Sequence, residues 1–179
     1  MVLPIGLLMI EHRLIEKMIA VMKKGLEKIK NTEKIDLNFI TDIVDFIQIY
    51  ADRCHHGKEE DILFRELKKK NTSTEHTKIM NELIEEHKFG RQKTKNLIAA
   101  KQKYSEGNTE SLKEIIALLQ ELTDFYPKHI EKEDKHFFKP IMSYFTQQEL
   151  DLLLQKEYQF DQNFIHQVYK DKVAFYQSK

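Results

Sequence analysis

The sequence contains few of the residues that break or cross-link a chain. Its 179 residues include one cysteine, three prolines and five glycines, and no tryptophan. An all-β sandwich depends on many tight turns, and so few glycines and prolines argue against one. The single cysteine, Cys54, cannot form a disulfide within the chain, so we expect a reducing compartment and a cytoplasmic protein.

Neither an excess of charge of one sign nor a long hydrophobic run is present. The 29 Lys and Arg residues balance 29 Asp and Glu residues, which argues against a broad basic surface for nucleic acid. The apolar residues 1–10 are followed at once by Glu11 and lack the basic region and cleavage site of a signal peptide. No stretch approaches the roughly 20 apolar residues that cross a bilayer. We therefore expect a soluble protein with no nucleic-acid partner and no membrane partner.

The composition that is present, with 41% apolar and 32% charged residues, is typical of long solvated helices around a core. Polar or helix-breaking stretches divide the chain into five helical segments of about 25–33 residues each. These breaks are residues 31–34, 71–74 and 105–109, and Pro140. Thr72 with Glu75, and Thr146 with Glu149, have the spacing of a capping box, which marks the start of a helix.

Short links between long helices force neighbouring helices to run antiparallel. We therefore predict an all-α fold: an up-down-up-down four-helix bundle over residues 1–145, with a C-terminal helix over residues 146–179 packed on the same domain. A dimer interface is the alternative role for this last helix, and its His166 is expected at the surface.

An apolar stripe, with residues alternately three and four apart, runs along each of the first four helices and contains one histidine. The four histidines are His12, His56, His87 and His129. On the second helix the predicted stripe is Phe46, Ile49, Arg53, His56, Glu60, Leu63 and Leu67. Glu60 and, on the fourth helix, Glu133 follow a histidine by one turn. Six polar groups in one core would be costly without partners, and a metal ion satisfies imidazole and carboxylate groups together.

The two His–Glu pairs belong to a repeated motif. Residues 56–64 and 129–137 both read His-x3-Glu-Asp-x-x-Phe, which indicates a pseudo-twofold site for two metal ions. Two bridging carboxylates supply four contacts and four histidines supply four more, which exceeds one tetrahedral zinc and leaves open positions on two larger ions. Mixed nitrogen and oxygen donors favour iron. We expect two iron ions, with zinc or a single iron as the alternatives.

Four separated motifs, in order along the chain, resemble the hemerythrin HHE cation-binding domain family over residues 5–145. They are Glu11-His12, His55–Phe64, Glu85–Arg91 and His129–Glu133. The resemblance implies a four-helix bundle around an oxo- or hydroxo-bridged di-iron centre. The iron ligands that it implies are His12, His56, His87 and His129, with Glu60 as a bridging carboxylate and Glu133 as its counterpart.

Two positions depart from the oxygen-carrying hemerythrins. Those carriers place a second histidine four residues along the third helix, where this chain has Arg91. We therefore expect one iron to have an extra open position, which argues against simple reversible oxygen carriage. The carriers' His-x4-Asp motif would select Asp134 on the fourth helix. We favour Glu133 because it repeats the spacing of His56 and Glu60, and Asp134 is the alternative.

Other residues near the motifs receive simpler interpretations. His55 and Glu59 are also four residues apart, but their stripe is more polar, so we expect them to face outward, with support of the ligands as the alternative. Cys54 is expected to be a small buried residue, with redox activity as the alternative. Tyr126 is expected to be a core aromatic, with a hydrogen bond to a metal-bound oxygen as the alternative.

These expectations favour a binding protein over an enzyme, because the sequence shows no domain for an electron donor. We expect a non-haem di-iron protein that binds or senses a small molecule, either O2, NO or peroxide, as a monomer or a homodimer. A di-iron oxidoreductase that reduces peroxide or oxygen is one alternative. A metal-responsive regulatory module is the other.

Overall fold

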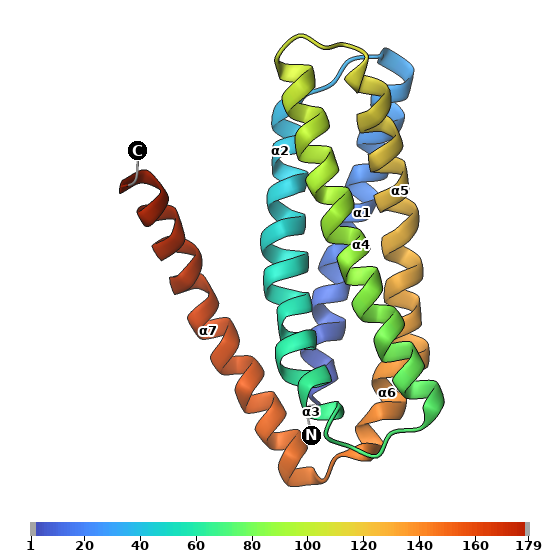
Figure 1. Ribbon diagram of the computed structural model, residues 1–179, viewed down its shortest axis with the longest axis vertical. Helices are drawn as coiled ribbons and strands as arrows, with labels where there is room; N and C mark the ends of the chain where they lie inside the picture. The colour runs from blue at the N-terminus through green and yellow to red at the C-terminus, as the bar shows by residue number, and fades with distance from the viewer. Residues whose placement is uncertain (1–2, 178–179) are drawn as a thin grey trace.

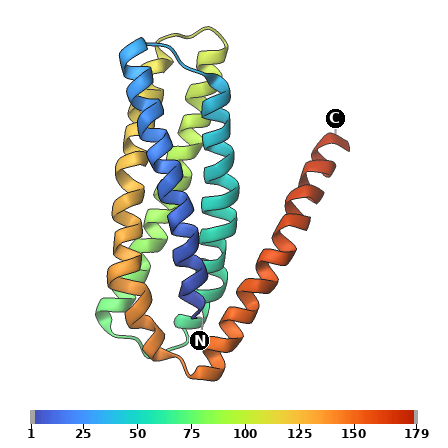
Figure 2. The ribbon, with the colours of Figure 1, turned by 180° about the vertical axis from the view of Figure 1, so that it is seen from behind.

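Helices make up every regular element of the computed structural model, which describes the backbone of residues 3–177 and the side chains of residues 3–164. Four long helical segments stand side by side, and a fifth slopes away from one end of this bundle (Figure 1 and Figure 2). The prediction of an all-α bundle is confirmed. Within residues 3–177, no helix is both long enough and apolar enough to cross a membrane.

The bundle consists of α1 (Pro4–Thr32), a second segment over residues 37–67, α4 (Thr74–Ser105) and a fourth segment over residues 111–141. The second segment comprises α2 (Leu37–Asp45), η1 (Phe46–His56), η2 (Glu59–Phe64) and α3 (Arg65–Leu67). The fourth comprises α5 (Ser111–Lys132), η3 (Glu133–Phe137) and α6 (Phe138–Ile141). A short 3-10 turn, η4 (Met142–Tyr144), then leads to α7 (Gln147–Gln177).

Side-chain caps fix where the later helices begin. Before α7, Thr146 and Glu149 form the predicted capping box, in which the Thr146 backbone N–H donates to Glu149 Oε2 at 2.8 Å. The cap of α4 is Ser73 rather than Thr72, because the Ser73 hydroxyl accepts a hydrogen bond from the His76 backbone N–H at 3.1 Å.

The second segment contains two π-helical stretches, η1 and η2, and this changes which residues face the core. A π-helix closes hydrogen bonds five residues apart, so its turn is wider than that of an α-helix. A buried residue accordingly stands at every fourth position, at Ile47, Ala51, His55, Glu59, Leu63 and Leu67. Cys54, His56, Lys58, Ile62 and Phe64 are buried beside this row. The predicted stripe of alternating threes and fours is wrong here, since Arg53 is exposed and Phe46 and Glu60 are only partly buried.

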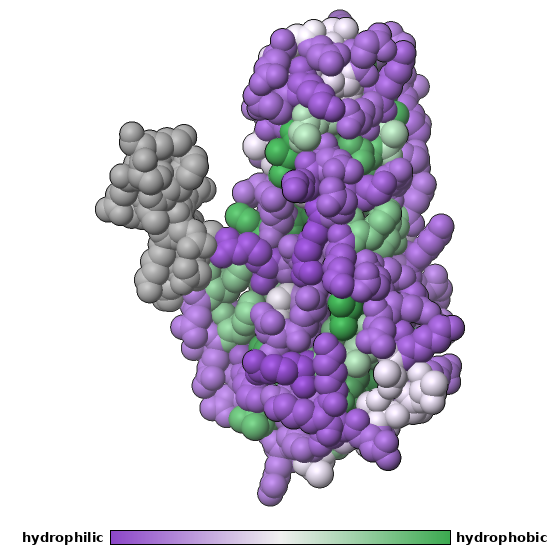
Figure 3. Space-filling view, in the orientation of Figure 1, coloured by the Kyte–Doolittle hydropathy of each residue, from purple (hydrophilic) through white to green (hydrophobic). Residues whose placement is uncertain are grey.

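A layer of buried polar side chains divides the bundle core into two apolar clusters. On α1, His12 lies between Leu8 of one cluster and Ile15 of the other. The predicted stripes of the first, third and fourth helices are buried along their whole length, so their histidines belong to this layer. On the face shown in Figure 3, the surface of the bundle is largely hydrophilic, with smaller apolar patches among the polar side chains.

α7 lies beside the four-helix bundle and contacts α1 and η2. Leu150 and Leu153 near its start are buried in the apolar cluster at that end of the bundle. Residues 178–179 of the predicted C-terminal helix, and the side chain of His166, lie outside the residues that the structure describes.

Candidate metal centre

Two adjacent groups of buried side chains offer metal ligands at the middle of the bundle. The first, called here the two-histidine cluster, consists of His12, His55, Glu59 and Glu133. The second, the three-histidine cluster, consists of His56, His87 and His129. Within each cluster the donor atoms lie within 4.8 Å of one another, and every one of these side chains is buried. The donors come from all four segments of the bundle.

Two glutamates connect the clusters. Glu59 Oε1 lies 3.4 Å from His55 Nε2, while its Oε2 lies 3.3 Å from His87 Nε2. Glu133 Oε2 lies 3.2 Å from His12 Nε2, while its Oε1 lies 3.4 Å from His129 Nε2. Each carboxylate therefore directs one oxygen toward each cluster, which is the arrangement of a bridging ligand.

Most of these donor atoms lack a hydrogen-bond partner within the described residues. Both carboxylate oxygens of Glu59 and of Glu133 are buried without a hydrogen bond. The same is true of the Nε2 atoms of His12, His55, His87 and His129. A buried polar group without a partner costs on the order of 1–3 kcal/mol, and more if it is charged. Two metal ions, one at each cluster, would satisfy all of these atoms at once, so the residues fit a pair of ions.

The carboxylates and imidazoles also shift one another's pKa values. Burial alone would lower the pKa of His12, but the hydrogen bond with Asp134 and the nearby Glu133 carboxylate outweigh it and raise the pKa to about 10. Burial of His87 is likewise outweighed by its carboxylate neighbours, which raise its pKa to about 11. Burial alone would raise the pKa of Glu133, but the neighbouring histidines hold it well below its usual range. Protons on these two imidazoles therefore place positive charge beside the buried Glu133 carboxylate in the metal-free protein.

A carboxylate contacts the outer ring nitrogen, Nδ1, of every histidine in the two clusters. The five pairs and their distances are His12 with Asp134 (2.7 Å), His55 with Glu11 (2.9 Å), His56 with Asp52 (3.4 Å), His87 with Glu60 (2.6 Å) and His129 with Glu86 (2.8 Å). An Nδ1–H that donates to a carboxylate leaves the opposite nitrogen, Nε2, to face the metal. The carboxylates thereby fix the orientation of all five rings.

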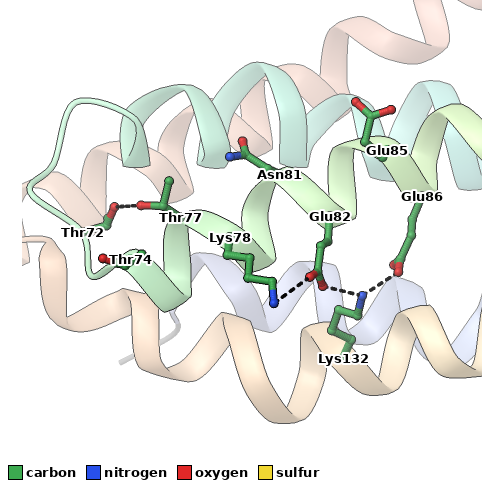
Figure 4. Close-up of a pocket in the computed structure, with 9 residues that line it drawn as sticks. All are labelled: Thr72, Thr74, Thr77, Lys78, Asn81, Glu82, Glu85, Glu86 and Lys132. Carbon is green, nitrogen blue, oxygen red and sulfur yellow. Dashed lines mark hydrogen bonds and ion pairs between the residues drawn. The ribbon is translucent and has the colours of Figure 1, made fainter.

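A cation in turn contacts each of these outer carboxylates. The cations are Arg13 on Asp134, Lys58 on Glu11, Lys132 on Glu86, and Arg91 on both Asp52 and Glu60. Figure 4 shows the Lys132 contact, in which Nζ lies 2.6 Å from Glu86 Oε1 and 3.1 Å from Glu82 Oε2 along an open pocket of about 790 Å³. Each clustered histidine therefore contacts a carboxylate, and that carboxylate contacts a cation.

Arg91 contacts the carboxylates that support two of the clustered histidines, His56 and His87. Its Nε donates to Asp52 Oδ1 and its Nη2 donates to Glu60 Oε1, each at 2.7 Å. His56 of η1 stands in the three-histidine cluster with His87 and His129, and His55 of the same segment stands in the two-histidine cluster. The structure therefore brings five histidines together, one more than the four predicted as ligands.

The structure brings together five of the six residues predicted as ligands: His12, His56, His87, His129 and Glu133. It places Glu60 outside the clusters, with a side chain that is 27% exposed and accepts from His87 Nδ1. Burial alone would raise the pKa of Glu60, but its hydrogen bonds with His87 and Arg91 lower it to about 2.

The expectation that His55 and Glu59 face outward is wrong, since they are 1% and 0% exposed and both belong to the two-histidine cluster. The π-helical geometry of η1 and η2 is the reason, because it rotates these residues inward. Glu133 rather than Asp134 stands in the cluster, and Asp134 supports His12 from outside. A clue was present in the sequence: His55-x3-Glu59 has the same spacing as His129-x3-Glu133.

Aromatic rings cover the outer faces of the histidine rings. Phe138 stacks on His12, with ring centroids 5.6 Å apart, and Phe125 stacks on His129 at 5.3 Å. A cavity of about 70 Å³ reaches His56 and is lined in part by Gly90, Thr94 and Tyr126. Apolar rings therefore shield the centre, and this small cavity lies on the side of the three-histidine cluster.

Comparison with known proteins identifies the family. Residues 3–141 match the hemerythrin HHE cation binding domain. No curated protein and no solved structure matches the chain. Because the match spans most of the chain and all seven clustered side chains, the protein belongs to the hemerythrin HHE family.

Proposed function

We propose that this member of the hemerythrin HHE family binds two iron ions, one at each donor cluster, and through them binds or senses O2, NO or peroxide. The observation that carries the proposal is the placement of Glu59 and Glu133, each with one oxygen toward either cluster. A single ion would leave half of these buried oxygens without a partner. Two ions satisfy them all.

The donor count differs between the two positions. The two-histidine cluster offers two imidazole nitrogens and one oxygen from each glutamate, whereas the three-histidine cluster offers three nitrogens and the other two oxygens. Mixed nitrogen and carboxylate donors suit iron, which accepts open positions for an added ligand. Iron at the two-histidine cluster has the smaller protein ligand set, so we place the small-molecule ligand there.

Bound iron would supply redox chemistry and an open coordination position. The protein's own groups hold the imidazoles with Nε2 inward and pair the outer carboxylates with Arg13, Lys58, Arg91 and Lys132. Stacked rings such as Phe138 on His12 limit the access of water. Slow access of water favours binding of a small neutral molecule over hydrolytic chemistry.

Metal content tests the first part of the proposal. The full-length chain, loaded with iron(II) without oxygen and then desalted, should retain two iron atoms per chain. His136→Ala is the matched control, because His136 is exposed and should not affect the count. Retention of one iron, or a preference for zinc when iron is in excess, would contradict a di-iron centre.

Ligand response tests the second part. Addition of NO, O2 or peroxide to the reduced iron-loaded protein should change its visible absorption within the mixing time. Sustained consumption of peroxide or oxygen with an added electron donor would support the oxidoreductase alternative instead. An iron-loaded protein whose spectrum responds to none of the three molecules would contradict the proposed role.

A further inference from the structure

α7 lies outside the residues 3–141 that match the family, yet acidic side chains from it lie next to the buried part of the bundle. Asp161 Oδ1 accepts a hydrogen bond from Lys58 Nζ at 2.6 Å. Phe160 packs on Gly57, where a Cβ atom would lie 3.1 Å from Phe160 Cζ. The missing side chain at Gly57 therefore allows the close approach of α7 that brings Asp161 to Lys58.

Lys58 is the residue that α7 covers. Its side chain is 0% exposed, and a buried ammonium group needs charged partners. Asp161 of α7 and Glu11 of α1 both accept hydrogen bonds from its Nζ. Burial alone would lower the pKa of Lys58, but these two carboxylates outweigh it and raise the pKa, so the ammonium group stays charged.

A second acidic residue of α7, Glu157, does not compete for this ammonium group at neutral pH. Its side chain is fully buried, and neither carboxyl oxygen has a hydrogen-bond partner within the described residues. Burial raises the pKa of Glu157 to about 8, so the carboxyl group is uncharged. The charge of Lys58 is therefore shared between Asp161 and Glu11.

Glu11 connects Lys58 to the two-histidine cluster. One oxygen of Glu11 accepts from Lys58, and the other accepts from His55 Nδ1 at 2.9 Å. The opposite nitrogen of that ring, Nε2, lies 3.4 Å from Glu59 Oε1. Three consecutive hydrogen bonds thus run from Asp161 on α7 to a histidine of the metal centre.

We propose that Asp161 of α7 is a positioning residue of the metal centre: it anchors Lys58, which anchors Glu11, which holds His55 with Nε2 toward the two-histidine cluster. The inference rests on the proposed metal binding. Arg13, Arg91 and Lys132, by contrast, support their carboxylates from within the bundle. α7 therefore acts on one of the two metal positions.

Titration of the metal-free, full-length chain with cobalt(II), followed by visible absorption, separates the two positions. The wild type should bind two ions, the first at the three-histidine cluster, which has more donors. Loss of a group that orients a metal ligand typically costs about 10–100-fold in affinity. Lys58→Met should weaken the second step by about 10-fold or more, and Asp161→Asn by a few-fold, with the first step unchanged. Lys58→Arg should restore most of the second step, because the cation is retained.

Lys132→Met is the matched control, since Lys132 plays the same part for Glu86 and His129. It should weaken the first step rather than the second. His12→Ala should abolish the second step and so assign it to the two-histidine cluster. Far-ultraviolet circular dichroism of each metal-free variant checks that the helices are intact, and the 38% exposed side chain of Asp161 makes its replacement mild.

Two ions bound with unchanged affinities in Asp161→Asn would overturn the inference, whatever the effect of Lys58→Met. Equal weakening of both steps would overturn it too, because α7 would then support the whole fold rather than His55. A wild-type chain that binds fewer than two ions would instead contradict the proposed function.

Discussion

The imidazole ring of His56 stacks on that of His87, with ring centroids 3.9 Å apart and planes 11° from parallel. Arg91 holds this pair from outside, because it contacts the carboxylate beside each ring, Asp52 for His56 and Glu60 for His87. Burial, together with the neighbouring imidazoles, lowers the pKa of His56 well below its usual value, so its ring is neutral and available as a ligand. The second segment thus supplies two neighbouring histidines, His55 to one cluster and His56 to the other.

His56→Ala should therefore remove one ligand of the three-histidine cluster and weaken the tighter cobalt(II) step by more than about 100-fold, beyond the loss expected for a supporting residue. The double variant His56→Ala/Arg91→His should recover part of this affinity, because a residue four positions after His87 projects from the same face of α4. Unchanged binding in His56→Ala would exclude His56 as a ligand. No recovery in the double variant would show that position 91 does not reach the cluster.

The variants Glu59→Gln and Glu60→Gln distinguish the roles of these two neighbouring carboxylates in metal binding. Glu59 has an oxygen toward each cluster, so its amide variant should lose binding of the second ion. Glu60 lies outside and supports His87, so its amide variant should retain two ions with about 10-fold weaker affinity. Iron counted per chain after desalting distinguishes them. Loss of one ion in Glu60→Gln, with two ions retained in Glu59→Gln, would instead indicate Glu60 as the bridging ligand.

Metal affinity should rise steeply with pH. His12 and His87 have pKa values of about 10 and 11 in the metal-free protein, so a metal ion must displace about two protons at pH 7. The logarithm of the binding constant should then increase by about two per pH unit between pH 6 and 8. Calorimetric titration with cobalt(II) in buffers of different ionisation enthalpy counts the released protons. A release of less than one proton would contradict these pKa shifts.

Stability of the metal-free protein should change with pH in the opposite sense. The folded pKa of each of these two histidines is raised above its unfolded value near 6.5, so their stabilising contribution is complete below that pH. It is lost as pH rises through about 10 and 11. Urea unfolding of the metal-free chain should therefore show a lower free energy of unfolding at pH 10 than at pH 6. A higher value at pH 10 would be inconsistent with protonated His12 and His87.

Glu157→Gln should stabilise the protein above neutral pH. The folded pKa of Glu157 is about 8 against an ordinary value of 4.5, so its contribution to stability is lost as pH rises through this interval. Lys58 opposes this shift in pKa, whereas Glu11, Asp161 and Glu59 add to it. At pH 8 the amide should raise the free energy of unfolding by roughly 3 kcal/mol relative to its effect at pH 5. Thermal unfolding at the two pH values measures this difference, and an equal effect at both would argue against a buried, protonated Glu157.

The sequence alone determined three of the four bundle helices and the candidate ligands that they carry. Along α1, α4 and α5 the spacing of apolar residues follows an ordinary α-helix, and burial follows that spacing residue by residue. His12, His87 and His129 could be identified because a polar residue on a continuous apolar stripe must point into the core. Glu133 continues the stripe of α5 into η3, so its position could be predicted in the same way.

Only the tertiary structure decided which residues of the second segment face the core. The same holds for the carboxylates that contact the clustered histidines from outside. The adjacent pairs His55-His56 and Glu59-Glu60 give His-x3-Glu spacing in two neighbouring registers. The choice between them depends on the hydrogen bonding of η1 and η2, because a π-helical turn rotates Glu59 inward and Glu60 outward. Contacts such as His12 with Asp134, which are 122 residues apart, depend on how the helices pack, and local spacing carries no information about such contacts.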